Sequence, residues 1–228
     1  MPENRFFLED AFEKGLTVYL KGDELRHLRV MRREIGETIE LVNGKNQLGH
    51  ALLTHLDKET ATLTLSNVID APPPERQLIL AQALLKPKNL DLVIEKGTEL
   101  GATAFWLFPG QKSEKKGLSP TQIQRCRHLT ISALKQCGRL DLPDIRIMPL
   151  LADWEEFPPG NRFFGDRHSE ESFRPPKGNT ILFVGPEKGF SSEEKKLLSH
   201  HTQGVRIHSY VLRAETAALC FLALANFP

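Results

Sequence analysis

A short glycine-containing segment, Gly185-Pro186-Glu187-Lys188-Gly189, has residue types that suit ligand binding. It follows the apolar run 180–184 and precedes Ser191, a good helix start. A strand that leads through a glycine turn into a helix is the place where open α/β sheets bind ligands. Gly185 lets the backbone approach a ligand closely, and Glu187 offers a carboxylate to a cation or a hydroxyl. The same pattern also fits a plain strand–helix turn.

A second segment, Leu212-Arg213-Ala214-Glu215-Thr216-Ala217, opens the apolar stretch that predicts a last helix at 214–226. An acid and a hydroxyl in the first turn of a helix stabilise its amino end. On that interpretation Glu215 is a helix-dipole acid that forms an ion pair with Arg213. A catalytic role for the segment fits equally well.

Several classes of site are poorly supported by the sequence. It contains neither GxxxxGK[ST] nor GxGxxG, which argues against a nucleoside triphosphate or a dinucleotide. The eight histidines lack the spacing of metal ligands, so no metal is predicted. Cys126, Cys137 and Cys220 form no CxxC pair, which argues against a zinc ribbon or a disulfide framework. Cys126 and Cys137 share a helical face and are expected in the core.

The balance of 30 Lys and Arg against 29 Asp and Glu conceals two basic clusters. The first, residues 26–33, holds four arginines and no acid; the second, residues 112–139, holds seven Lys and Arg against Glu114 alone. Arginine suits phosphate because its planar fork donates parallel hydrogen bonds. A single cluster of this kind is commonly a solvated helix face. Two of them indicate a contact with RNA or DNA.

The first third of the chain predicts a small β-barrel. Stretches rich in β-branched residues at 17–20, 38–42, 47–55 and 60–69 read as short strands. Asn43-Gly44 is a hairpin turn signal, and Asp23–Arg33 is the one helix expected among these strands. Pro72-Pro73-Pro74 predicts a stiff linker. We therefore expect one domain at 1–72 and a second at 75–228.

The second domain alternates strands and helices, which predicts an α/β fold with a mainly parallel sheet. Strands are expected at 77–85, 104–108, 180–184 and 205–208, and helices at 90–100, 120–137, from 192 onward and at 214–226. Ser119 and Ser191 each begin a capping box, and Gly138 ends a helix. Residues 158–178, rich in proline, predict a surface excursion away from any site.

The sequence carries no apolar run near the ~20 residues that a bilayer span needs. Its amino-terminal residues include acids and lack the apolar core of a signal peptide. We therefore expect a cytoplasmic protein with no membrane partner.

Six short motifs follow one another along the chain: Asn4-Arg5-Phe6-Phe7, Gly22 with His27–Arg32, Glu95–Gly101, Gln136–Arg139 with Pro143, Gly185-Pro186-Glu187, and Leu212–Ala217. Taken in this order, they resemble the RsmE family (ribosomal small-subunit RNA methyltransferase E) of the SPOUT superfamily. No one of them would suffice, because each is short. Their order and spacing cover nearly the whole chain and make the resemblance specific.

The resemblance implies a PUA-like RNA-binding barrel followed by a trefoil-knotted methyltransferase domain. It implies a homodimer, S-adenosylmethionine as the cofactor, and methylation at N3 of a uridine in the decoding region of 16S rRNA in the small ribosomal subunit. By matching positions, two loops should bind the cofactor, with backbone groups on the adenine. The implied cofactor-binding residues are Leu182, Val184, Gly185, Pro186, Glu187, Ile207, His208, Val211 and Leu212.

The resemblance also implies roles in catalysis and RNA binding. Uridine N3 must lose a proton to become a nucleophile, and a guanidinium near O2 or O4 stabilises the resulting charge; Arg213 is the candidate. Glu215 either removes the proton or anchors Arg213. The expected RNA-binding residues are Arg5, Arg26, His27, Arg29, Arg32, Arg33 and Arg139.

The chain departs from the family pattern at four positions. Lys188 and His208 replace glycines, Tyr210 replaces an arginine, and Lys135 replaces a glutamate. Three of the four lie on the expected cofactor loops. Lysine does not easily adopt the positive φ that glycine tolerates, and His208 could fill part of the pocket. The alternative function is therefore a non-catalytic RNA-binding protein of the same fold with an impaired cofactor site.

Overall fold

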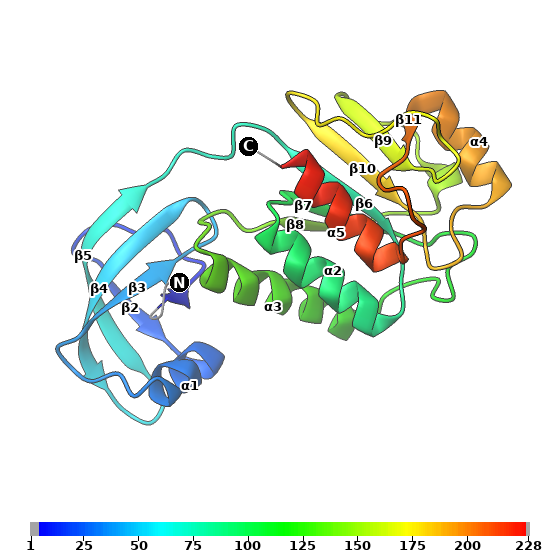
Figure 1. Cartoon of the computed structure of the whole chain (residues 1–228). Helices are drawn as coiled ribbons and strands as arrows, with labels where there is room; N and C mark the ends of the chain where they lie inside the picture. Colours follow the sequence, from blue (N-terminus) through cyan, green and yellow to red (C-terminus); the bar gives the residue numbers. More distant parts are fainter. Residues whose placement is uncertain (1–4, 227–228) are drawn as a thin grey trace. The chain divides into compact units, whose positions relative to one another are not determined.

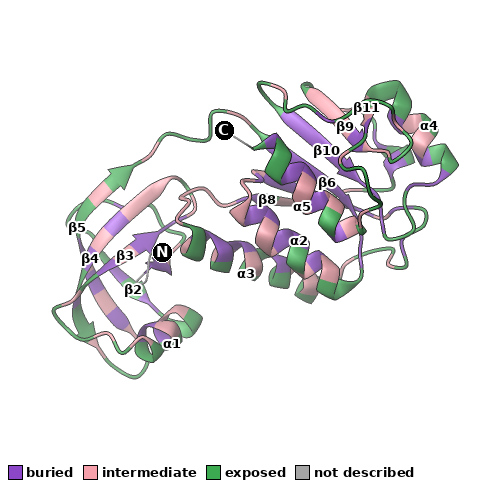
Figure 2. Cartoon of the chain, viewed as in Figure 1, coloured by how far each residue is buried: buried purple, intermediate pink, exposed green. Residues whose placement is uncertain are grey.

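The computed structural model describes residues 5–226, and the chain forms two compact units (Figure 1). The first, called the barrel unit here, comprises residues 1–73 and 131–142. The second, called the α/β unit, comprises residues 74–130 and 143–228. Each unit has an apolar core of its own, visible as buried ribbon in Figure 2. Asn4, the first residue of the amino-terminal motif, lies outside the described residues.

The barrel unit contains one curled sheet of five strands in the order β1-β3-β4-β5-β2 (Figure 1). The strands are β1 Arg5–Phe7, β2 Thr17–Leu20, β3 Thr38–Val42, β4 Gln47–Leu56 and β5 Ala61–Asp70. All pairs are antiparallel except β1 with β3. Alternate residues point inward, and helix α1 (Gly22–Val30) adds Leu25 and Leu28 to the core. The predicted small barrel is therefore present, with β1 as a strand that the sequence did not indicate.

Helix α1 is shorter than expected, since it ends at Val30 rather than at Arg33. Arg32 adopts a positive φ of 54°, a conformation that few residues other than glycine adopt. A left-handed residue stops the helix, so Arg32 and Arg33 lie beyond it. The hairpin between β3 and β4 turns where expected, with positive φ at Gly44 and Asn46.

The α/β unit contains six strands in the order β11-β9-β10-β6-β7-β8, and every pair is parallel. The strands are β6 Leu78–Ala83, β7 Ala104–Phe108, β8 Asp144–Ile147, β9 Asn161–Gly165, β10 Thr180–Val184 and β11 Gln203–Val205. The chain builds outward from β6 through β7 to β8 and then returns to the other side of β6 with β10. The direction of winding therefore reverses between β6 and β10, and ligands bind at such a point.

Helices cover both faces of this sheet (Figure 1). They are α2 Pro87–Glu99, α3 Pro120–Cys137, α4 Ser192–His201 and α5 Ala214–Ala225, with a 3-10 turn η1 at Leu151–Asp153. One core joins Leu80 of β6 to α2 and α5; the other joins Ile79 and Ala81 to η1 and α4. Successive strand residues point to opposite faces, so strands buried on both sides read as continuous apolar runs. No helix within residues 5–226 is long and apolar enough to cross a membrane.

Two predictions about the α/β unit are wrong. The strand expected at 205–208 is Gln203–Val205, and the chain then leaves the sheet as an irregular segment. The excursion expected at 158–178 contains β9, which pairs with both β10 and β11. Its core residues, Phe163 and Phe164, stand between proline-rich turns that obscured the strand.

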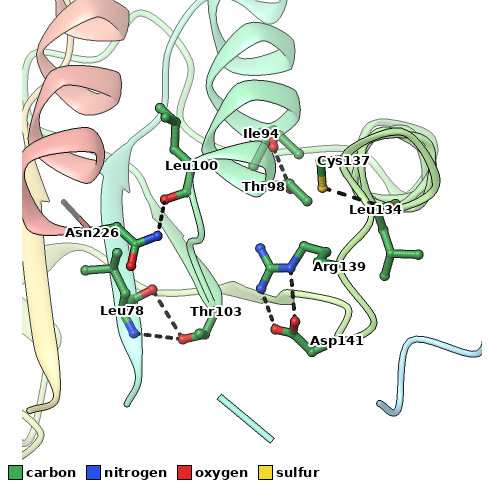
Figure 3. Close-up of polar contacts among 10 residues, drawn as sticks. All are labelled: Leu78, Ile94, Thr98, Leu100, Thr103, Leu134, Cys137, Arg139, Asp141 and Asn226. Carbon is green, nitrogen blue, oxygen red and sulfur yellow. Dashed lines mark hydrogen bonds and ion pairs between the residues drawn. The ribbon is translucent and has the colours of Figure 1, made fainter. Parts of the chain in front are cut away.

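Side-chain contacts fasten the amino-terminal end of the parallel sheet (Figure 3). Thr103 Oγ1 accepts a hydrogen bond from Leu78 N at 2.9 Å, which joins the starts of β6 and β7. Asn226 Nδ2 donates to Leu100 O at 3.2 Å, which joins the ends of α5 and α2. A Cβ on Gly101 would lie 2.3 Å from Asn226 Nδ2, so this contact needs glycine. The opposite, carboxyl-terminal end of the sheet is left for the turns that form a pocket.

The close packing of α2 on α5 makes Gly97→Ala destabilising. An added Cβ would lie 2.8 Å from Phe105 Cε1 and 3.2 Å from Leu222 Cδ1. Overpacking costs about 1–3 kcal/mol and exceeds the ~1 kcal/mol that alanine gains in helix propensity. We expect the free energy of unfolding to fall by about 1 kcal/mol.

Urea unfolding followed by tryptophan fluorescence measures this change in the free energy of unfolding, because Trp106 and Trp154 both lie in this unit. Gly117→Ala, with open space around it, is the control; an equally stable Gly97→Ala variant would contradict the packing argument.

Candidate functional site

A cavity of about 510 Å³ opens at the carboxyl ends of β9 and β10. Its volume is typical of small-molecule sites, and it lies beside the point where the winding of the sheet reverses. Its walls come from the β9 end, the β10–α4 turn, the chain after β11 and the start of α5. The lining residues are Lys112, Gly165–His168, Val184–Phe190, Ser192, Lys195, Ile207, His208, Tyr210–Leu212, Ala214 and Ala217.

The turn 185–190 forms one wall, and its glycines are needed for packing and for conformation. A Cβ on Gly185 would lie 2.9 Å from Phe190 N, so only glycine fits against this backbone. Gly189 takes a positive φ of 68° and donates its N–H to Pro186 O at 2.7 Å. Lys188 is not among the described residues with positive φ. The lysine therefore sits at a position that demands no glycine, and the turn keeps its path.

Glu187 ties this turn to the start of α2. Its Oε1 accepts hydrogen bonds from Lys86 N at 3.0 Å and from Asn89 Nδ2 at 3.3 Å. Helix α2 has no cap from its own N-cap side chain and no acid in its first turn, so Glu187 provides the negative charge that a helix amino end favours. Burial alone would raise the pKa of Glu187, but these hydrogen bonds together hold it below the usual value. In this structure the carboxylate of Glu187 is used for positioning.

Glu194 fastens the other end of the turn. The side chain is buried, and its two oxygens accept Ser191 N and Gln111 N, each at 2.8 Å. Ser191 Oγ accepts Glu194 N at 3.0 Å, which completes the capping box expected from the sequence. Lys112 Nζ donates to Phe190 O at 3.1 Å. The loop after β7 is thus joined to the start of α4, and both elements contribute to the pocket wall.

The irregular segment 206–213 forms the opposite wall. Among the hydrogen bonds described for residues 207–212, the only backbone donor is Tyr210 N, which bonds His208 Nδ1 at 3.1 Å. Residues 208–211 are exposed, so other backbone N–H and C=O groups of this run can bond a bound molecule in place of water. His208 and Tyr210 are exposed, and the cavity remains open beside them.

Asp166 and Lys195 are pocket residues that sequence reasoning missed. Asp166 follows β9 directly, and its Oδ1 accepts Lys195 Nζ at 3.0 Å and His168 N at 3.2 Å. Burial alone would raise the pKa of Asp166, but Lys195 and the His168 N–H lower it below its usual value. The apolar Phe163-Phe164-Gly165 run before Asp166 was the available signal, because a charged residue that follows a buried strand lies at the ligand-binding edge.

Eight of the nine expected cofactor-binding residues line the cavity. They are Val184, Gly185, Pro186, Glu187, Ile207, His208, Val211 and Leu212. Leu182 does not, since its side chain is fully buried in the core two residues earlier in β10. Two segments about twenty residues apart in the sequence are thus brought together around one cavity. Their binding roles stay predictions.

Arg213 and Glu215 lie at the pocket end of α5 but not in its lining. Arg213 is the exposed N-cap residue of the helix, between the lining residues Leu212 and Ala214. Glu215 is buried in the first turn. The ion pair considered for these two residues does not form within the described part of the chain. The guanidinium of Arg213 therefore remains accessible to a substrate.

The arginines expected to bind RNA all lie in the barrel unit, where several have partners. Arg5 is buried and pairs with Glu40 at 2.8 Å across β1 and β3. Arg139 pairs with Asp141 (Figure 3), and Arg33 pairs with Glu37 at 3.3 Å. Arg29 donates to Asp57 O. These side chains stabilise the unit, which reduces what they can offer to phosphate.

Arg26 and Arg32 are the most available of the expected set. Arg26 is 76% exposed, although it contacts Asp23 at 2.9 Å, and Arg32 is exposed on the chain after α1. Burial and the charge of Lys135 lower the pKa of His27, which is therefore largely neutral near pH 7. Lys135, one of the departures from the family pattern, pairs with Glu24 at 2.6 Å. Cys137, expected in the core, is exposed.

A parallel sheet with a pocket at its carboxyl edge, in a chain that also contains a small barrel, is the setting for comparison with known families. The chain belongs to the family defined by the RNA methyltransferase domain, which matches residues 72–226. The RNA methyltransferase PUA domain matches residues 20–66. The fold class expected from the resemblance, a PUA-like barrel with an α/β methyltransferase unit, is confirmed.

Particular relatives cover almost the whole chain. Ribosomal RNA small subunit methyltransferase E of Rickettsia conorii is 25% identical over 98% of this chain and 95% of its own length. The crystal structure of the enzyme of that name from Neisseria gonorrhoeae, bound to S-adenosyl methionine, is 27% identical with a TM-score of 0.88 over 96% and 95% of the two chains. A Legionella pneumophila methyltransferase, in complex with the same cofactor, is 25% identical with a TM-score of 0.87 over 97% and 96%.

The position of Glu187 predicts a pH-dependent stability difference. Its pKa is lowered on folding, so the charged form contributes stability above the ordinary carboxylate pKa and loses it as pH falls through the lowered value. We expect wild type to exceed Glu187→Gln in stability by a constant amount from pH 5.5 to 8, and the difference to shrink below about pH 4.5. The amount is below about 1 kcal/mol because the side chain is exposed. Urea unfolding at several pH values measures it; a difference that stays the same at pH 3.5 would contradict it.

Proposed function

We propose that this chain uses S-adenosylmethionine to methylate N3 of a uridine in the decoding region of 16S rRNA, within the small ribosomal subunit. One observation carries the proposal. The segments 184–187 and 207–212, matched to the cofactor loops of the family, converge on one cavity that ends at Arg213. The relatives named above support the reaction, and their coverage of nearly the whole chain supports a common substrate.

The residues of the cavity fit the cofactor. Apolar side chains, including Val184, Ile207 and Leu212, suit the two faces of adenine. The free backbone groups of residues 207–212 suit the polar edge of that ring. Asp166 offers a negative charge to the amino group of the cofactor's methionine part, and Lys195 offers a positive charge to its carboxylate. When bound, the cofactor supplies an electrophilic methyl group on a sulfonium.

The remaining chemistry belongs to the residues at the start of α5. The Arg213 guanidinium stabilises the negative charge that develops on a uracil carbonyl oxygen as N3 loses its proton. Glu215, buried in the first turn of the helix, accepts that proton or anchors Arg213. The turn 185–190 and the segment 206–213 fix the reacting groups relative to one another, and positioning of this kind supplies much of a rate enhancement.

We propose that residues 1–72 act as the RNA-binding domain and residues 75–228 as the methyltransferase domain. Arg26 and Arg32 contact phosphates, while the shape of the RNA and its unpaired bases provide selectivity. The family resemblance supports a homodimer and a cytoplasmic location, where small ribosomal subunits are found.

The alternative, an RNA-binding protein that has lost its cofactor site, finds no support in the pocket. Lys188 sits at a position that needs no glycine, and Gly189 takes the positive φ. His208 is exposed and leaves a cavity of about 510 Å³ open. Calorimetric titration with S-adenosylmethionine and S-adenosylhomocysteine separates the two functions. Saturation near one ligand per chain supports the enzyme, whereas no binding at millimolar ligand, with and without RNA, would support the alternative.

We expect Arg213→Ala to separate cofactor binding from catalysis. The variant should bind S-adenosylhomocysteine as wild type does, because Arg213 lies outside the cavity lining. Methyl transfer to 30S subunits should fall about 10²- to 10³-fold, as it does when one charge-stabilising donor is removed. Arg206→Ala, which removes an exposed arginine from the same segment, is the control and should keep its activity. Wild-type turnover by Arg213→Ala would exclude Arg213 from the mechanism.

We expect the double variant Arg26→Gln with Arg32→Gln to bind RNA more weakly and with less dependence on salt. Each lost phosphate contact lowers the slope of log K against log salt by about 1. The measurement is filter binding to 30S subunits at several salt concentrations. Lys14→Gln, an exposed change in the same unit, is the control. An unchanged slope in the double variant would show that Arg26 and Arg32 do not contact RNA phosphates.

A further inference from the structure

Two exposed aromatic rings stand on the wall of the pocket. His208 and Tyr210 both line the cavity, with ring centroids 5.6 Å apart and an angle of 38° between the ring planes. Tyr210 N donates to His208 Nδ1 at 3.1 Å, which restricts the imidazole. The pair is therefore a local unit in which one ring supports the other.

The fold itself makes little use of the Tyr210 ring. Its side chain is 78% exposed, and it belongs to none of the apolar cores of the described chain. Val211, the next residue, is 72% exposed. Adjacent large apolar side chains left in water at the mouth of a cavity indicate a binding surface rather than packing.

The ring is carried by the segment that also holds Arg213, the residue proposed above to stabilise charge. Tyr210 is three residues before Arg213, and both are carried by the segment that leads into α5. A base whose N3 is to react must leave its stack, and unstacked bases are commonly held against aromatic side chains. Cations beside the cavity, including Lys188 and Arg167, suit the phosphates that flank such a base.

We propose that Tyr210, supported by His208, is a stacking surface for a base of the RNA substrate, either the target uridine or its neighbour. This inference rests on the proposed function and adds a substrate-positioning residue to it. The ring is not assigned to adenine of the cofactor, because it projects into solvent while Leu212 and Ile207 are partly covered at the inner wall.

The test compares Tyr210→Ala, Tyr210→Phe and wild type in RNA binding and cofactor binding. Tyr210→Ala should raise the Kd for unmodified 30S subunits roughly 5- to 100-fold, since a stacked base is lost. Its Kd for S-adenosylhomocysteine should stay within about twofold, because the ring lies outside the adenine site proposed above. Tyr210→Phe keeps the ring and should bind as wild type does. Tyr19→Ala, which removes the other exposed tyrosine of the chain, is the control.

A second measurement locates the RNA base beside the ring directly, without a substitution in the protein. A decoding-region RNA with 5-iodouridine at the target position should photo-crosslink to Tyr210 in wild type, and mass spectrometry locates the modified residue. Loss of S-adenosylhomocysteine affinity in Tyr210→Ala would assign the ring to the cofactor instead, and a change from dimer to monomer in sedimentation would assign it to a subunit interface. Either result, or unchanged RNA affinity, overturns the proposal. Failure of wild type to bind either ligand would instead overturn the proposed function, and this inference with it.

Discussion

Hydrogen bonds from backbone N–H groups to two carboxylates hold the turn on which the pocket depends. Glu187 accepts Lys86 N at the start of α2, and Glu194 accepts Gln111 N from the loop after β7. The partners are 101 and 83 residues away in the sequence. A charged acceptor bonded to a backbone donor is among the stronger hydrogen bonds in proteins. The turn 185–190 is therefore joined to both neighbouring elements that flank the cavity.

The backbone of the pocket wall demands glycine at some positions and not at those where a departure from the family pattern was expected. Gly185 has no room for a Cβ, and Gly189 takes a left-handed conformation. Lys188 lies between them, and the structure requires neither a missing Cβ nor a positive φ at its position. His208 and Tyr210 belong to the irregular segment 206–213, where their side chains extend toward solvent. The side chains of His208 and Tyr210 leave the pocket open and change the surface at its opening, which a substrate contacts.

The basic residues of the barrel unit divide into structural and available groups. Arg5 is buried and pairs with Glu40, and the half-buried Lys135 pairs with Glu24, so these charges are neutralised within the fold. Arg26 and Arg32 retain exposed guanidiniums on and after α1. Leaving a buried charge without its partner costs far more than removing an exposed one. Mutation of the paired residues would therefore report on stability, and mutation of the exposed pair on RNA contact.

The sequence by itself determined the local elements, while the kind of site came from the family resemblance. The capping boxes at Ser119 and Ser191, the Asn43-Gly44 hairpin and the buried strand 180–184 each depend on neighbouring residues, and all appear where expected. Resemblance of short motifs also anticipated eight residues of the cavity wall.

Tertiary structure alone decided three features. They are the pairing of Asp166 with Lys195, the membership of residues 131–142 in the barrel unit, and the departure of the chain from the sheet after Val205. These features depend on contacts between residues far apart in the chain, which no local periodicity or propensity records.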